Sequence, residues 1–130
     1  MLSALIDTNV LVSGLTSDKG SPARIVDAFK ENRFNLFHCP EIVAEYHDVL
    51  SRGWLGLDTV DVHDLIELII LTGFSIMPEK SSMAMTDEDD RVFYDAAKNG
   101  GAYLVTGNIK HYPKEKFVVT ATQFLMLIEG

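Results

Sequence analysis

The chain opens with the stretch LSALIDTNVLV at residues 2–12. An apolar run ends just before Asp7, three polar residues follow, and the apolar pattern then resumes. In open α/β sheets, ligands bind in the crevice outside the carboxyl ends of the strands, so a carboxylate at this point is well placed for chemistry. Asp and Thr are also preferred helix N-caps, so Asp7 or Thr8 is equally explained as the cap of a following helix. The stretch predicts a strand that leads into a candidate site.

A second acidic group, DEDD at residues 87–90, precedes a segment with an apolar helical stripe at residues 92–97. Acids in the first turn of a helix are stabilised by the helix dipole, by about 0.3–1 kcal/mol each, so a helix N-terminus is one explanation. Four consecutive acids exceed what capping requires, and they repel one another unless a cation neutralises them. Oxygen ligands suit Mg²⁺, Mn²⁺ or Ca²⁺, whereas Zn²⁺ prefers Cys and His. The group therefore indicates a hard divalent cation.

A third acidic pair, Glu41 and Glu45, lies in PEIVAEY at residues 40–46. The two residues are four apart, so they share a helical face. Glu41 is expected in the first helical turn, where a solvated face near the positive end of the helix dipole explains it. Glu45 lies one turn further on and has apolar neighbours, which makes it the better candidate for a pocket.

The composition is that of an ordinary globular protein. Hydrophobic residues make up 47% of the 130 residues and charged residues 23%, which predicts one domain over residues 1–130 with a core of its own. The single cysteine, Cys39, excludes an intramolecular disulfide and a multi-cysteine zinc site, and we expect it to be a small buried hydrophobe. No segment approaches the ~20 apolar residues of a membrane span, so we expect a cytoplasmic protein with no membrane partner.

The formal net charge of −8 argues against a protein that holds nucleic acid by simple backbone electrostatics, because phosphate contacts are made by Lys and Arg. It does not exclude a nuclease, since part of the negative charge belongs to the expected metal site. The acidity also predicts a basic partner.

Short apolar runs alternate with longer amphipathic segments, which is typical of an α/β protein with a mainly parallel sheet. Pro marks two helix starts, at Ser21-Pro22 and Cys39-Pro40, and Gly100-Gly101 marks a helix end. The expected strands lie at about 2–6, 34–38, 74–77, 103–105 and 117–119, and the expected helices at about 21–32, 40–50, 60–72, 88–99 and 121–128.

Taken in order, these stretches resemble the motifs of PIN-domain ribonucleases. Residues 5–13 look like the family's opening motif, whose Asp is the first metal-binding carboxylate, and residues 40–46 resemble the helix that supplies its Glu. Residues 87–97, with the strand YLVTGN at 103–108 behind them, are similar to the third motif. The resemblance spans roughly residues 5–112 and implies a three-layer α/β/α PIN-like domain with about four to five strands. It maps the family's carboxylates onto Asp7, Glu45 and Asp90.

The resemblance implies a Mg²⁺- or Mn²⁺-dependent endoribonuclease that hydrolyses RNA phosphodiester bonds. Those three carboxylates would be its catalytic and metal-binding groups, with Asp87 or Asp89 as additional ligands. A bound divalent cation lowers the pKa of its water and stabilises the leaving oxygen. The residues that would orient the carboxylates or contact the phosphate are Thr8, Asn9, Thr106, Asn108 and His111. A role as turn or capping residues explains the first three equally well.

Many PIN domains carry a fourth acid after the Val-Thr-Gly strand end, where this chain has Asn108 and, three residues later, His111. An amide oxygen brings no charge, so a second metal ion is expected to be held weakly. One alternative is therefore a PIN-fold module that binds RNA or protein with little or no catalysis. A phosphoaspartate-type signalling or phosphatase domain also places an Asp after its first strand, but the haloacid-dehalogenase pattern needs a second Asp where this chain has Asn9.

The Gly-Asn-x-Lys-His ending after the fourth expected strand makes the toxins of toxin–antitoxin pairs (VapC-like proteins) the most similar part of the family. This resemblance implies an antitoxin protein as partner and a homodimer.

Overall fold

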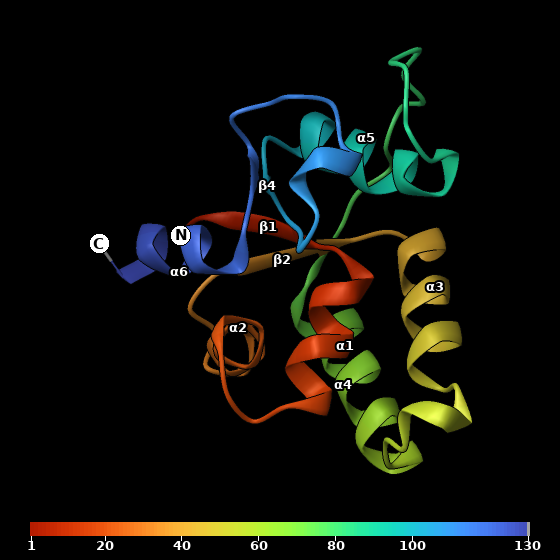
Figure 1. The fold of residues 1–130 in the computed structure, drawn as a ribbon, viewed down its shortest axis with the longest axis vertical. Coiled ribbons are helices and arrows are strands. Elements are labelled where there is room, and N and C mark those ends of the chain that lie inside the picture. The colour runs from red at the N-terminus through yellow and green to blue at the C-terminus, as the bar shows by residue number, and fades with distance from the viewer. Residues whose placement is uncertain (130) are drawn as a thin grey trace.

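Five parallel strands form the centre of the computed structural model, which describes residues 1–129 (Figure 1). The strands are β1 (Ser3–Ile6), β2 (Asn35–His38), β3 (Phe74–Ser75), β4 (Tyr103–Val105) and β5 (Val118–Val119). Their order across the sheet is β3-β2-β1-β4-β5, and every neighbouring pair is parallel. The α/β fold predicted from the sequence is confirmed.

Helices cover both faces of this sheet. The α-helices of the described residues are α1 (Thr8–Thr16), α2 (Ser21–Lys30), α3 (Pro40–Leu50), α4 (Thr59–Thr72), α5 (Arg91–Gly100) and α6 (Ala121–Glu129), and the short 3-10 turns are η1 (Gly53–Leu55), η2 (Glu88–Asp90) and η3 (Ile109–His111). In Figure 1, α5 lies above the strands and α1, α2 and α4 lie below them. The sheet is thus the middle of three layers. Across residues 1–129, no helix is both long and apolar enough to pass through a membrane.

The strand order reverses at β1, because β2 and β3 follow on one side of it and β4 and β5 lie on the other. Ile6 pairs with Val105, and the backbone N–H of Asp7 donates to the carbonyl of Val105 at 2.8 Å. The carboxyl ends of β1 and β4 therefore lie side by side. A crevice at such a topological switch point is where open α/β sheets bind their ligands.

The core lies on both faces of β1, whose Ala4, Leu5 and Ile6 are fully buried. Successive side chains of a strand point to opposite faces, so a continuous apolar run is what a parallel strand between two helical layers requires. Cys39 is also buried, as expected.

Several element ends differ from the prediction, most of them by one or two residues. The strand β3 ends at Ser75 rather than residue 77, and an irregular segment follows. The acid-led helix begins as the 3-10 turn η2 and becomes α-helical only at Arg91, because the Asp87 carboxylate caps the tighter turn through the N–H of Asp89. That helix runs one residue further than predicted, to Gly100, and Gly101 caps it in the left-handed conformation at φ 62°.

Gly14 of α1 packs closely against α2. A Cβ at this position would lie 2.6 Å from the backbone oxygen of Pro22 and 2.8 Å from a methyl group of Val26. Gly14→Ala should lower the free energy of unfolding by about 1–3 kcal/mol, because a backbone atom cannot yield as a side chain can. Ala is intrinsically favoured over Gly in a helix by about 1 kcal/mol, so a net loss reports the contact itself.

Denaturant unfolding monitored by circular dichroism measures this difference. Gly53→Ala is the matched control, because a Cβ at Gly53 would meet no atom of residues 1–129 within 4 Å. Equal stability of the two variants would contradict the close packing of α1 against α2.

Candidate metal centre

Asp7 lies at the carboxyl end of β1 and its side chain is held from β4. The residue occupies the N-cap position of α1, but its side chain makes no capping hydrogen bond. Its Oδ2 instead accepts from the hydroxyl of Thr106 at 2.7 Å and from the hydroxyl of Tyr112 at 3.2 Å. The side chain is 8% exposed. Two donors on one oxygen fix the orientation of the carboxylate, and the other oxygen accepts no hydrogen bond from residues 1–129.

Glu45 approaches from the second turn of α3. It is half-buried and accepts a hydrogen bond from the hydroxyl of Thr8. Burial raises the pKa of Glu45, the charges of Asp7 and Asp89 raise it further, and the hydrogen bond from Thr8 opposes the rise. Glu45 is therefore close enough to the other acids to interact with them.

Asp90 closes the cluster from the junction of η2 and α5. Its pKa is raised to about 6, first by burial and then by the charges of Asp7, Asp87 and Glu45, while His111 acts in the opposite direction. The charge of Asp7 thus raises the pKa of both Glu45 and Asp90, and the charge of Glu45 also raises that of Asp90. Like charges held together in this way favour either a proton or a cation.

The ligand oxygens of these three carboxylates do not all lie within 4.8 Å of one another. Among residues 1–129, the ligand atoms of three acidic or histidine residues come within 4.8 Å of one another in only one place, at His63, Asp64 and Glu67 on the exposed face of α4. Mg²⁺ usually keeps several waters and takes only one or two direct carboxylates, so an open set of oxygen ligands fits it. Asp7, Glu45 and Asp90 supply oxygen ligands alone, which suits Mg²⁺ or Mn²⁺ and not Zn²⁺.

The remaining acids of the DEDD group are less deeply placed. Asp87 and Asp89 are both exposed. Asp87 accepts from the N–H of Asp89 at 2.9 Å, which is the helix-terminus role considered from the sequence. Both still act on the cluster through their charges, Asp87 on the pKa of Asp90 and Asp89 on that of Glu45.

The polar residues expected beside the carboxylates fall into two groups. Thr8 and Thr106 are buried and donate directly to the carboxylates, so they are more than turn residues. The side chains of Asn9, Asn108 and His111 are exposed, and within residues 1–129 they make no hydrogen bond. Of these three, only His111 acts on the cluster, through its effect on Asp90.

Two tyrosines support the site and were not singled out from the sequence as site residues. Tyr112 donates to Asp7, and Tyr46, fully buried on α3, donates to the carbonyl of Ile6 at the end of β1. Burial and the charge of Asp7 raise the pKa of both hydroxyls, so both remain protonated donors. The sequence offers a signal only for Tyr46, which is the neighbour of Glu45.

The fold and the site together define an α/β protein with a carboxylate centre at the topological switch point. The chain belongs to the PIN-domain family, whose sequence model matches residues 3–110. Nuclease activity and divalent-metal binding are associated with this family. The chain is also similar to the uncharacterized protein MJ1680 of Methanocaldococcus jannaschii, with 32% identity over 116 residues that cover 82% of this chain and 71% of the relative.

Proposed function

We propose that this protein is a metal-dependent endoribonuclease. The observation that carries the proposal is the cluster of Asp7, Glu45 and Asp90 at the switch point of the sheet. The three carboxylates come from separate elements, and the charge of Asp7 raises the pKa of both others. Groups with strongly perturbed pKa values are concentrated at functional sites. A buried carboxylate held by two neutral donors, as Asp7 is, suits a permanent ligand better than a surface charge.

Asp7, Glu45 and Asp90 would hold Mg²⁺ or Mn²⁺, with Asp87 and Asp89 near enough to add negative charge. When bound, such an ion activates water and stabilises charge on the phosphoryl group. Thr106 and Tyr112 orient Asp7, and Thr8 orients Glu45. Asn108, which follows the carboxyl end of β4, brings no charge to the site. The residues present therefore support one strongly held metal ion, and a second ion would be held weakly at most.

The test is cleavage of an end-labelled, unstructured RNA in Mn²⁺, in Mg²⁺ and in excess chelator. Wild type should cleave only with metal, and Glu45→Gln should reduce the rate by at least about ten-fold, because it removes a charged ligand but keeps the side chain's shape. Glu31→Gln, on an exposed residue at the end of α2, is the matched control. Cleavage that persists in chelator would contradict a metal-dependent mechanism.

Tyr112→Phe should weaken Mn²⁺ binding by about 10–100-fold, the usual cost of removing a hydrogen bond that orients a ligand. Thr106 still donates to Asp7 in this variant, so the fold should be kept. Calorimetric titration of Mn²⁺ measures the change. Tyr94→Phe is the matched control, because the buried hydroxyl of Tyr94 has no hydrogen-bond partner within residues 1–129. Equal Mn²⁺ affinities in the two variants would show that the Tyr112 hydroxyl does not contribute to metal binding.

We further propose that the nuclease acts as the toxin of a toxin–antitoxin pair. The Gly107-Asn108-Ile109-Lys110-His111 segment on the rim and the net charge of −8, which suits a basic protein partner, support this role. Expression of wild type should arrest growth, and Asp7→Asn should not. Co-expression of the neighbouring small reading frame should relieve the arrest and yield a complex. A wild type that does not affect growth would contradict the toxin role but not the proposed nuclease activity.

A homodimer is expected from the same resemblance to toxins of toxin–antitoxin pairs. Light scattering of the purified protein tests this expectation.

A catalytically weak module that binds RNA or protein is the second candidate, and Asn108 in place of an acid is the observation that favours it. It predicts RNA binding without metal-dependent cleavage. The phosphoaspartate alternative has less support. Within the described part of the chain, the hydrogen bonds to the Asp7 carboxylate come from Thr106 and Tyr112, and none comes from a lysine.

A further inference from the structure

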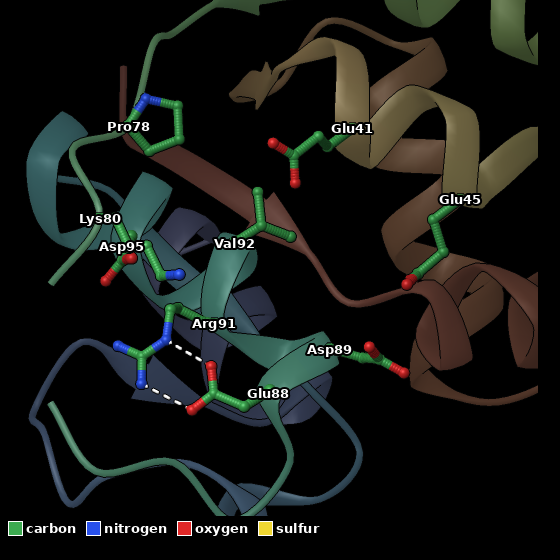
Figure 2. Close-up of a pocket in the computed structure, with 9 residues that line it drawn as sticks. All are labelled: Glu41, Glu45, Pro78, Lys80, Glu88, Asp89, Arg91, Val92 and Asp95. Carbon is green, nitrogen blue, oxygen red and sulfur yellow. Dashed lines mark hydrogen bonds and ion pairs between the residues drawn. The ribbon is translucent and has the colours of Figure 1, made fainter. Parts of the chain in front are cut away.

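A pocket of about 400 Å³ opens beside the carboxylate cluster (Figure 2). Figure 2 shows Glu45 and Asp89 at one end of it, and Lys80 and Asp95 at the other. Its volume lies in the range of about 300–1,000 Å³ of pockets that bury small ligands. Because Glu45 belongs to both the cluster and the pocket, a nucleotide whose phosphate lies at the cluster is within reach of this space.

The charges of the pocket argue against a second phosphate. Four carboxylates besides Glu45 line it, and the only cations among its lining residues are Lys80 and Arg91. Arg91 makes five hydrogen bonds, to the Glu88 carboxylate and to Ser81 and Met83 of the segment before η2. A guanidinium has five N–H donors, so Arg91 has none left for a ligand. Arg91 instead links Glu88 of η2 to the segment before it, and so holds this side of the pocket in place.

One buried acceptor in this pocket has no partner. Asp95 is 2% exposed, and its Oδ2 accepts from the N–H of Ser81 at 3.1 Å. Its Oδ1 has no hydrogen-bond partner within residues 1–129. Buried carboxylate oxygens are normally paired, so this oxygen marks a place for a donor that comes from outside the chain.

The partners offered at this end of the pocket suit guanine. Asp95 can only accept hydrogen bonds when ionised, and Lys80, exposed and without an ion pair among the described residues, can only donate. Guanine presents two adjacent donors, N1–H and N2–H, beside the acceptor O6, and Lys is a common partner of its O6 and N7. Pro78 and Val92 supply apolar surface for the faces of the ring. Unpaired bases in single-stranded RNA are read in this way, on their edges and faces.

We propose that this pocket receives the base of a nucleotide next to the scissile phosphate and selects guanine, with Asp95 accepting from the base and Lys80 donating to it. The proposal rests on the proposed ribonuclease function for its placement beside a scissile phosphate. It assigns a substrate preference to a nuclease whose RNA target is otherwise undefined.

The test is a calorimetric or NMR titration of the full chain, in chelator, with the 5′-monophosphates of guanosine, adenosine, cytidine and uridine. Guanosine monophosphate should bind about ten-fold more tightly than the other three, and Lys80→Gln and Asp95→Asn should each remove that difference. Lys80 is on the surface, so its variant remains informative if Asp95→Asn fails to fold. Lys114→Gln, on an exposed residue outside the pocket, is the matched control and should keep the preference.

Equal binding of the four nucleotides would overturn the proposal, and so would tighter binding of a polyamine such as spermidine than of guanosine monophosphate. Mapping of cut sites in a random-sequence RNA separates this proposal from the proposed function. Cleavage with guanine enriched at one position, and with that enrichment lost in Lys80→Gln, supports the pocket. Cleavage without base preference overturns the proposed guanine selection by the pocket and still supports the nuclease function. No cleavage of any RNA contradicts the nuclease, while selective binding of guanosine monophosphate would still support the pocket.

Discussion

Asp7→Asn should reduce metal-dependent RNA cleavage by at least about a hundred-fold, because loss of a ligand's charge should cost no less than the roughly 10–100-fold lost when a residue that orients a ligand is removed. The substitution removes the charge of the most buried carboxylate in the cluster. Its amide oxygen can still accept from Thr106 and Tyr112, so the local structure should be kept. Initial rates of cleavage of a labelled RNA at saturating Mn²⁺ measure the effect.

The matched control for this variant is Asp58→Asn. Asp58 is an exposed acid that caps α4 and does not line the metal centre. The Asp58→Asn variant should cleave RNA at the wild-type rate despite a small loss of stability. If Asp7→Asn cleaved RNA as fast as Asp58→Asn, the carboxylate cluster would not be the catalytic centre.

Asp90→Asn should abolish metal binding and yet stabilise the metal-free protein at neutral pH. Burial and neighbouring acids raise the pKa of Asp90 from 3.8 to about 6, so the fold disfavours its ionised form. The cost to stability is therefore fully present above about pH 6 and disappears as the pH falls below 3.8. Because the side chain is partly solvated, we expect Asp90→Asn to be more stable than wild type by about 1 kcal/mol at pH 8 in chelator.

Thermal unfolding in chelator at pH 8 and at pH 4 measures this dependence. The advantage of Asp90→Asn should shrink towards zero at the lower pH. Addition of Mn²⁺ at pH 8 should raise the melting temperature of wild type and not that of the variant. A variant less stable than wild type at pH 8 in chelator would contradict the electrostatic strain assigned to Asp90.

Much of the fold was predictable because its signals are local. The apolar run before Asp7 is long enough for a strand buried on both faces, and Pro22 and Pro40 mark helix starts that the structure confirms. The ends of η2 and β3 were not predictable, because they depend on side-chain caps and on pairing with strands distant in the sequence.

The three acids Asp7, Glu45 and Asp90 were predicted as a set from the order of their motifs, and the structure brings them into one electrostatic cluster. The supporting residues were harder to find. Tyr112 lies 105 residues from Asp7 along the chain, and Asp95 looks from the sequence like a polar residue on an amphipathic helix. Their roles depend on long-range contacts, which local sequence patterns do not encode.

The decisive measurement is calorimetric titration of Mn²⁺ into wild type, Asp90→Asn and His63→Ala at pH 7.5. The His63→Ala variant removes one residue of the exposed group His63, Asp64 and Glu67 on α4, whose ligand atoms lie within 4.8 Å of one another. This group is the alternative metal site. A metal centre at the switch point predicts that binding is lost in Asp90→Asn and unchanged in His63→Ala. Binding that survives in Asp90→Asn and disappears in His63→Ala would place the metal on α4 and contradict a catalytic centre built from the three carboxylates.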